Sequence, residues 1–266
     1  MHTRRTFLTL GAAGAAALLA ACSSTSSALN KTGEAVGGAV KKTVSIIPGM
    51  GKGTKKIAII GANGKSGSAL VEEALRQGHE VTAIARKAEY TNDAVKNVVH
   101  KDLFDLTRED VAGFDAVISA FAAWTPETLP QHKKAAEHLC SLLAGSDTRL
   151  FIVGGAGTLY TDDGMKTRLM DTPEFPADYQ GVAQATAQSY EVLKASKDVR
   201  WTYVSPAGEY DAKGQRTGKY ELGGDVIKLN SKGESYISYA DLAIAIIDEV
   251  SNGAFINKRF TAVGER

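Results

Sequence analysis

Gly61, Gly64 and Gly67 recur every third residue between an apolar run at residues 56–60 and a segment at 66–77 with apolar residues at helical spacing. In a strand–loop–helix unit of this kind, the first glycine permits a tight turn and the second lets backbone amides approach a pyrophosphate. The third glycine lets the helix pack closely on the strand. The N-terminus of the helix adds free N–H groups and a partial positive charge for the phosphates. The pattern therefore predicts a dinucleotide-binding loop.

The side chains around this loop indicate which dinucleotide it binds. An NAD site commonly has an Asp or Glu about 20 residues after the loop, where it binds the ribose 2′-hydroxyl. Here the second predicted strand is followed by Arg86 and Lys87, with no carboxylate. A planar guanidinium and a neighbouring ammonium suit the 2′-phosphate of NADP, and Asn63 and Lys65 in the loop could assist. Ser66 in the same loop is also a predicted cofactor-binding residue. We therefore expect NADPH, with NADH as the alternative if Arg86 and Lys87 are only solvated residues at the strand exit.

Four more residues follow predicted strands at the edge where open α/β sheets bind their ligands. Asp102 follows the third strand, where its carboxylate either meets the adenine amino group or caps the next turn. Phe121 follows the fourth strand, and Gly154 and Gly155 follow the fifth. The small residues at this edge are expected to leave room for the nicotinamide ring. All four are predicted cofactor-binding residues.

The elements that position these residues alternate between strand and helix from residue 55 onward. Short apolar runs typical of buried parallel strands are separated by segments of helical periodicity. Strands are expected at 56–60, 80–85, 98–100, 116–119, 150–153 and 201–205, and helices at 66–77, 131–143 and 177–196. This order predicts an α/β fold, a Rossmann-type doubly wound parallel sheet.

The residues after 206 have a different sequence pattern, with shorter apolar runs between glycine-containing turns. Strands are expected at 216–222, 226–229, 234–237 and 258–263. Ser238 is expected to cap a helix over 242–250, with Asp241 completing a capping box. We expect this small C-terminal region to cover a substrate cleft and not to form a separate domain.

The N-terminus has the pattern of a bacterial export signal. Arg4 and Arg5 precede an apolar, Ala-rich run of about 15 residues, which is too short to span a bilayer comfortably. The arginine pair resembles the twin-arginine signal, a route that exports folded proteins. Residues 19–22 (Leu-Ala-Ala-Cys) resemble the lipobox, in which Cys22 is acylated. The alternative is an ordinary cleaved signal with a chance cysteine.

This pattern divides the chain into three parts. We expect a signal peptide at 1–21, a flexible tether at 22–54 and an NAD(P)-binding Rossmann domain at 55–266. The mature protein would be anchored by lipid to a bacterial membrane and would face the periplasm or the cell exterior.

Charge and cysteine content argue against several kinds of partner. The net charge is +1, and removal of residues 1–21 leaves 29 basic against 30 acidic residues. Such a balance gives no bulk attraction for nucleic acid or anionic lipid, so we expect membrane contact through the lipid anchor alone. The two cysteines, Cys22 and Cys140, give no disulfide framework, and no histidine lies in a metal-binding pattern.

Together with the glycine loop, four segments resemble one known family. They are 102–105 (Asp-Leu-Phe-Asp), 153–157 (Val-Gly-Gly-Ala-Gly), 201–207 (Trp-Thr-Tyr-Val-Ser-Pro-Ala) and 236–241 (Tyr-Ile-Ser-Tyr-Ala-Asp). Over about residues 55–265 the chain resembles the atypical short-chain dehydrogenase/reductases of the NmrA-like and biliverdin-reductase-B-like kind. The most similar branch is that of NAD(P)H-binding proteins and NADH-flavin reductases. The resemblance implies an NAD(P)H-dependent oxidoreductase with a small-molecule acceptor, whose identity it does not specify.

Many short-chain reductases use a Tyr-x-x-x-Lys pair as proton donor. Tyr190 and Lys194 have this spacing, but they lie too late on the predicted helix, so we interpret them as a coincidence on the helix surface. Tyr179 is nearer the expected place, but Ala183 stands where the lysine is needed. No catalytic acid is identified, and Tyr179 and Phe121 are the candidates that remain.

The missing acid favours a planar acceptor. A flavin can accept a hydride and take its proton from water, so positioning would supply most of the rate. We therefore expect hydride transfer from NADPH to a flavin, a quinone or a similar planar acceptor, with a non-catalytic, NmrA-like redox sensor as the alternative. The aromatic residues that could either stack on an acceptor or pack in the core are Phe121, Trp124, Tyr160, Phe175, Tyr179 and Tyr210.

Overall fold

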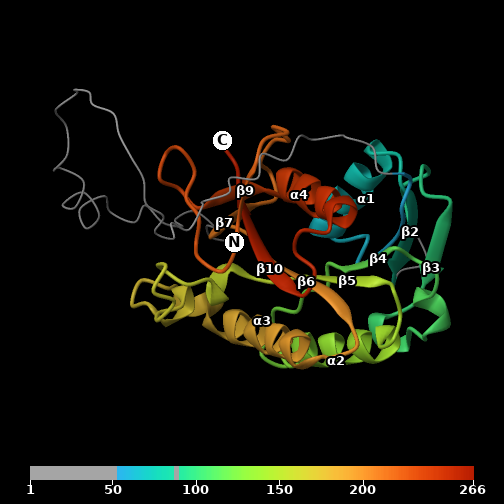
Figure 1. The fold of residues 1–266 in the computed structure, drawn as a ribbon, viewed down its shortest axis with the longest axis horizontal. Coiled ribbons are helices and arrows are strands. Elements are labelled where there is room, and N and C mark those ends of the chain that lie inside the picture. Colours follow the sequence, from blue (N-terminus) through green and yellow to red (C-terminus); the bar gives the residue numbers. More distant parts are fainter. Residues whose placement is uncertain (1–52, 87–89) are drawn as a thin grey trace, which may run out of the picture. The chain divides into compact units, whose positions relative to one another are not determined.

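The computed structural model describes residues 53–86 and 90–266, which are built around an eight-stranded sheet (Figure 1). The strand order is β3-β2-β1-β4-β5-β6-β10-β8, and only the β10–β8 pair is antiparallel. The strands are β1 (Lys56–Ile60), β2 (Glu80–Ala85), β3 (Asn97–His100), β4 (Ala116–Ser119), β5 (Arg149–Val153), β6 (Arg200–Ser205), β8 (Glu221–Gly223) and β10 (Lys258–Val263). The predicted Rossmann-type sheet is confirmed. The strand order reverses beside β1, so the ligand crevice of such folds opens at the carboxyl ends of β1 and β4.

Two pairs of helices cover the two faces of the sheet. Figure 1 shows α1 (Lys65–Arg76) beside α4 (Tyr239–Asn252) on one face, and α2 (Gln131–Leu143) beside α3 (Ala177–Ala195) on the other. The three helices predicted in the first 200 residues are confirmed to within one residue at each end. No helix in the described ranges is long and apolar enough to cross a membrane.

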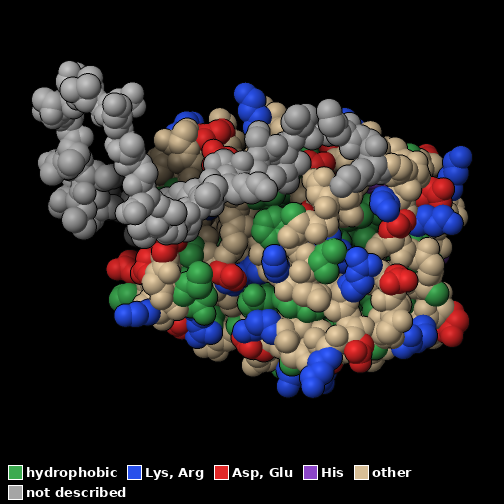
Figure 2. All heavy atoms as spheres, viewed as in Figure 1, with side chains coloured by type: hydrophobic (Ala, Val, Ile, Leu, Met, Phe, Trp, Pro, Cys, Tyr) green, Lys and Arg blue, Asp and Glu red, His purple; other side chains and the backbone are tan. Residues whose placement is uncertain are grey.

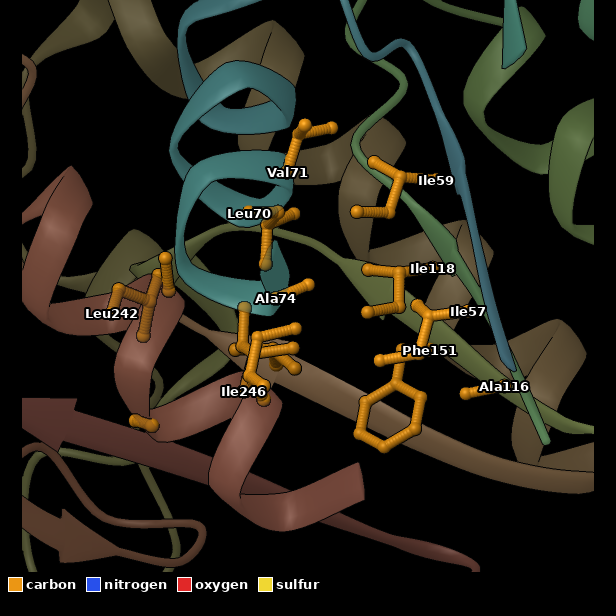
Figure 3. Close-up of a cluster of buried hydrophobic side chains, with 14 of the residues drawn as sticks. Ile57, Ile59, Leu70, Val71, Ala74, Ala116, Ile118, Phe151, Leu242 and Ile246 are labelled. Atoms are coloured by element: carbon orange, nitrogen blue, oxygen red, sulfur yellow. The ribbon is translucent and has the colours of Figure 1, made fainter. Parts of the chain in front are cut away.

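The core between α1 and the sheet explains why β1 is a continuous apolar run. Ile57 and Ile59 of β1 lie in the same buried cluster as Leu70 of α1 and Leu242 of α4 (Figure 3). Ala58 and Ile60 of β1 are buried in the cluster on the opposite face. Because both faces of the strand are buried, no polar alternation is left in its sequence.

The C-terminal region departs from the predicted strand pattern. The expected strand at 216–222 is reduced to β8, because the chain turns at Gly218, whose φ is +76°. The expected strand at 226–229 is wrong, since Val226 forms only an isolated bridge with Tyr160. A strand that the sequence analysis missed, β7 (Glu209–Asp211), instead pairs in parallel with β9 (Tyr236–Ser238).

The predicted cap of α4 is half confirmed. The Ser238 hydroxyl accepts a hydrogen bond from the Asp241 N–H at 3.0 Å, as an N-cap residue should. The Asp241 carboxylate does not complete a capping box. It accepts hydrogen bonds from the N–H groups of Thr217 and Gly218, at 2.9 Å each, and so fixes the turn before β8.

The face shown in Figure 2 carries Lys and Arg side chains interspersed with Asp and Glu side chains. Neither sign forms a continuous patch on this face. The arrangement agrees with the nearly balanced composition of the chain.

Candidate functional site

The glycine loop connects β1 directly to α1, as predicted. Gly61 has a φ of +77°, a left-handed conformation that favours glycine. A Cβ atom on Gly67 would lie 2.1 Å from the carbonyl oxygen of Gly61, so no side chain fits where α1 crosses the loop. The first and third glycines are therefore required by the fold itself.

Gly64 has a different role. Its backbone is extended, with φ −77° and ψ 162°, which other residues adopt without strain. A Cβ atom at this position would approach one atom closely, the carbonyl oxygen of Gly61, at 3.1 Å. The fold therefore gives a weaker reason for glycine here than at Gly61 or Gly67. A ligand that approaches the backbone closely would supply the missing reason.

The first turn of α1 presents unused hydrogen-bond donors. The Ser68 N–H donates to the Gly64 carbonyl at 2.8 Å, but the described residues supply no acceptor for the N–H groups of Lys65, Ser66 and Gly67. Free amides at a helix N-terminus are suited to phosphate oxygens. The loop therefore has the conformation and the donors that a pyrophosphate needs. The Asn63 and Lys65 side chains are exposed beside it.

The carboxyl ends of β2 and β3 bring together two predicted cofactor residues. The Arg86 side chain is 80% exposed, and its Nε lies 3.8 Å from Oδ2 of Asp102. Oδ1 of Asp102 accepts a hydrogen bond from the Phe104 N–H at 3.0 Å, so the capping role left open by the sequence is the one that the structure contains. A contact between Asp102 and an adenine stays a prediction.

Phe121 follows β4 at the same edge of the sheet. Its ring forms T-shaped contacts with the His132 ring, at a centroid distance of 5.5 Å, and with the Phe104 ring, at 6.1 Å. His132, which the sequence analysis did not single out, has its Nε2 3.2 Å from the backbone nitrogen of Ala123. Burial lowers the pKa of His132, so it is the neutral imidazole that holds the β4–α2 loop.

At Gly154 and Gly155, after β5, other side chains of the protein lie at or near the place that a Cβ atom would take. A Cβ atom on Gly154 would lie 2.0 Å from the Tyr203 hydroxyl, which donates to the Thr186 carbonyl at 3.0 Å. On that side of the backbone, the expectation that Gly154 leaves space for a nicotinamide ring is wrong, because Tyr203 fills it. A Cβ atom on Gly155 would lie 3.2 Å from Thr186 Oγ1. Contact between a ligand and the backbone of Gly154 or Gly155 stays a prediction.

Tyr190 and Lys194 are engaged with neighbouring side chains. The Tyr190 ring stacks on Tyr203 at a centroid distance of 4.6 Å, and the Arg259 guanidinium lies 4.9 Å from the Tyr190 ring centre. Lys194 Nζ also lies over this ring, 4.9 Å from its centre, and forms an ion pair with Glu191. Burial raises the pKa of Tyr190 to about 12, whereas a catalytic tyrosine needs a lowered pKa. Tyr190 is thus a half-buried residue that packs against Tyr203 and Arg259, and not a residue of the helix surface as the sequence suggested.

The remaining aromatic candidates have varied surroundings. Tyr179 lies in the first turn of α3, at the carboxyl edge of the sheet. Trp124, in the loop after β4, is 66% exposed, and Phe175 packs against Gly157. Tyr210 lies on β7, where its hydroxyl contacts the glycine loop and not open solvent. Phe121, Trp124 and Tyr179 also lie at the carboxyl edge of the sheet, and they stay the candidates for contact with an acceptor.

A cavity of about 580 Å³ opens at the opposite edge of the sheet. Its lining includes Asp115, which pairs with Lys55 at 3.0 Å, and Arg149, which forms a buried ion pair with Glu249. Because these charges are already paired and ligands of open α/β folds bind at carboxyl ends, this cavity is not the predicted site.

Two predicted site residues, Cys22 and Lys87, lie outside the described residues. The other cysteine, Cys140, is buried, and burial raises the pKa of its thiol to about 11. A thiol with so high a pKa is a poor nucleophile at neutral pH, which agrees with its interpretation as an apolar core residue.

Comparison with known proteins gives one family match. The family described as NAD(P)H-binding matches residues 61–252, from the first loop glycine to the end of α4. The chain is 46% identical over 211 residues to YwnB of Bacillus subtilis strain 168, an uncharacterised protein. The match covers 79% of this chain and 99% of that protein.

Solved structures of similar proteins share the fold. A candidate NADH-flavin reductase from Streptococcus pneumoniae TIGR4 is 47% identical, with a TM-score of 0.77, and the match covers 79% of this chain and 100% of that one. A candidate exported protein from Burkholderia pseudomallei is 36% identical, with a TM-score of 0.71 and the same coverage of 79% and 100%.

Proposed function

Because this chain belongs to the NAD(P)H-binding family, we propose that it binds NADPH at the loop 61–67 and transfers hydride to a flavin, a quinone or a similar planar acceptor. The observation that carries the proposal is the loop itself. Gly61 and Gly67 fix its conformation, and the amides of residues 65–67 have no acceptor among the described residues. The residues present therefore fit a bound pyrophosphate.

The chain's own residues would bind and orient the reactants. The first turn of α1 would hold the pyrophosphate, and the segments after β4 and β5 would border the nicotinamide. A bound NADPH supplies the hydride. Tyr190 is packed against Tyr203 with a raised pKa, so an acceptor that takes its proton from water suits this site better than a carbonyl. Phe121 and Tyr179 are the residues proposed to face the acceptor.

The choice of NADPH over NADH rests on the residues at the end of β2. The Arg86 guanidinium is exposed, and its one ion pair within residues 53–86 and 90–266 is the 3.8 Å contact with Asp102. An exposed pair at this distance contributes little, so the guanidinium is available to a 2′-phosphate. Lys87, the next residue in the sequence, is proposed to add a second positive charge beside the 2′-phosphate.

A non-catalytic redox sensor is the second candidate. The tyrosine and lysine with the family's catalytic spacing are engaged in packing, with Lys194 over the face of the Tyr190 ring. A protein that binds the dinucleotide without turning it over would need no proton donor.

We further propose that the protein is exported by the twin-arginine route and anchored by lipid on Cys22. The sequence at residues 19–22 supports the anchor, and the similarity to a candidate exported protein supports export. Because this route carries folded proteins, the domain could leave the cytoplasm with NADPH already bound.

Steady-state oxidation of NADPH tests the reductase proposal. With flavin mononucleotide or a water-soluble quinone as acceptor, we expect many turnovers per chain. Binding of NADPH without oxidation by any planar acceptor would favour the sensor, and failure to bind any nicotinamide dinucleotide would contradict both.

A further inference from the structure

A hydrogen bond joins the phosphate-binding end of α1 to the C-terminal region. The hydroxyl oxygens of Ser66 and Tyr210 lie 2.8 Å apart, although the two residues are 144 positions apart in the sequence. Ser66 lies in the first turn of α1, and Tyr210 lies on β7. This is the one hydrogen bond that the Ser66 hydroxyl forms with the described residues.

The Tyr210 side chain is held firmly at this place. Its ring stacks on Tyr239, the first residue of α4, at a centroid distance of 3.7 Å and an interplanar angle of 25°. The ring also packs against the core on the α1/α4 face. Burial raises the pKa of Tyr210, so its hydroxyl stays protonated at any physiological pH. A rigid, neutral hydroxyl is suited to fixing the orientation of a partner.

The backbone that carries Tyr210 is also anchored. Just before it, the Gly208 N–H donates to the Ser235 hydroxyl at 3.0 Å, and the Glu209 N–H donates to the Ser235 carbonyl at 2.8 Å. This backbone leaves the carboxyl end of β6 two residues earlier, at Pro206. The Ser66–Tyr210 bond therefore links the glycine loop to the segment that leaves β6 at the same edge of the sheet.

We propose that Tyr210 is a positioning residue for the dinucleotide pyrophosphate. Its hydroxyl fixes the Ser66 side chain and, through it, the direction of the amides of residues 65–67. Ser66 then binds phosphate through its backbone N–H, while its hydroxyl stays hydrogen-bonded to the Tyr210 hydroxyl. The inference rests on the proposed binding of NADPH at this loop.

The variant Tyr210→Phe tests this, because it keeps the ring and its stack on Tyr239 and removes only the hydroxyl. Loss of one hydrogen bond that orients the loop should raise the dissociation constant for NADPH about three- to tenfold. Adenosine 2′-monophosphate, which lacks the pyrophosphate, should bind wild type and variant equally. A general loss of structure would weaken both ligands, so this split separates positioning from damage.

Tyr220→Phe is the matched control. The Tyr220 hydroxyl likewise forms one partly buried hydrogen bond, which it donates to Asp248 at 2.6 Å. Asp248 is bound by Gln77 beyond the last residue of α1, at the end of that helix remote from the loop. This variant should lower thermal stability and leave the dissociation constant for NADPH unchanged.

A double-mutant cycle with Ser66→Ala completes the test. If the two hydroxyls serve only each other, Ser66→Ala, Tyr210→Phe and the double variant should have the same dissociation constant for NADPH. A larger loss in Ser66→Ala than in Tyr210→Phe, with additive effects in the double variant, would show that the Ser66 hydroxyl itself binds phosphate and would overturn the inference. An unchanged dissociation constant for NADPH in Tyr210→Phe would overturn this inference but not the proposed function. A wild-type protein that binds neither NADPH nor NADH would overturn the proposed function as well.

Discussion

Arg86 and Asp102 face each other across the carboxyl ends of β2 and β3, with Nε of Arg86 3.8 Å from Oδ2 of Asp102. The Asp102 carboxylate is held by a hydrogen bond from the Phe104 N–H, while the Arg86 side chain is 80% exposed. A phosphate that approached this edge would therefore meet a carboxylate held in place and a guanidinium that is free to reorient. Because the exposed ion pair is weak, the guanidinium can turn to the phosphate at little cost.

Arg86→Ala should weaken the binding of NADPH and spare that of NADH. Charge-assisted hydrogen bonds between a guanidinium and a phosphate contribute about 1.5–3 kcal/mol, which corresponds to about ten- to a hundredfold in the dissociation constant. Titration of both dinucleotides against both proteins, by calorimetry, measures the difference.

Arg200→Ala is the charge-matched control for this variant. Arg200 is an exposed arginine at the start of β6, at the opposite edge of the sheet, so its loss should affect neither dinucleotide. Equal losses for NADPH and NADH in Arg86→Ala would mean that Arg86 stabilises the strand exit and does not bind the phosphate.

Gly67→Ala should destabilise the domain, because its Cβ atom would lie 2.1 Å from the carbonyl oxygen of Gly61. Overpacking of this kind costs about 1–3 kcal/mol of the free energy of unfolding. Gly224→Ala, at a position with no atom within 4 Å of the added Cβ, should leave it nearly unchanged. Urea denaturation of the two variants gives the comparison, and equal stabilities would contradict the close crossing of α1 over the loop.

Tyr190→Phe should preserve both the turnover number and its pH dependence. With a pKa raised to about 12, Tyr190 stays protonated throughout the working range and contributes no titration there. The phenylalanine ring also keeps the stack on Tyr203 and the contact with Arg259. We expect a turnover number within about twofold of wild type and superimposable pH profiles. A loss of about a hundredfold or more with unchanged KM would identify Tyr190 as the acid after all.

The part of the site that could be predicted is the part encoded in contiguous residues. β1 is recognisable because both of its faces are buried, so that residues 56–60 form a short apolar run that ends at Gly61. The spacing of Gly61 and Gly67 follows from the geometry of a helix that crosses a strand. These relationships involve residues that are near neighbours in the chain.

The rest depends on partners distant in the sequence. Nothing around Gly154 reveals that the Tyr203 hydroxyl occupies the place of its side chain. The predicted strand at 216–222 is too long because Asp241, which fixes the turn before β8, lies in the later helix α4. Tyr210 could be recognised as aromatic but not as the partner of Ser66, since a hydrogen bond between distant residues leaves no periodic signal.

Cys22→Ser should move the protein from the membrane fraction to the soluble periplasmic fraction of the cells that export it. Without the thiol no acyl chain can be attached, and each buried CH₂ group of such a chain contributes about 0.8 kcal/mol to membrane binding. Cys140→Ser alters the only other cysteine and should leave the protein in the membrane fraction. Unchanged fractionation of Cys22→Ser would remove the proposed lipid anchor.

The central claim is that the loop 61–67 binds the pyrophosphate of a nicotinamide dinucleotide, and Gly64→Val tests it most directly. Valine can adopt the extended backbone at this position, and its Cβ would require the Gly61 carbonyl, 3.1 Å away, to move by only a few tenths of an ångström. The domain should therefore keep its circular dichroism spectrum and most of its thermal stability.

The measurement is the dissociation constant for NADPH of the wild type and of Gly64→Val, determined side by side by calorimetry. The valine side chain should block the approach of the phosphates to the amides, and loss of two hydrogen bonds to a charged group, at about 1.5–3 kcal/mol each, corresponds to at least about a hundredfold. We predict that the wild type binds one NADPH per chain and that the folded variant binds none measurably. Equal affinities in the two proteins would contradict the assignment of the loop.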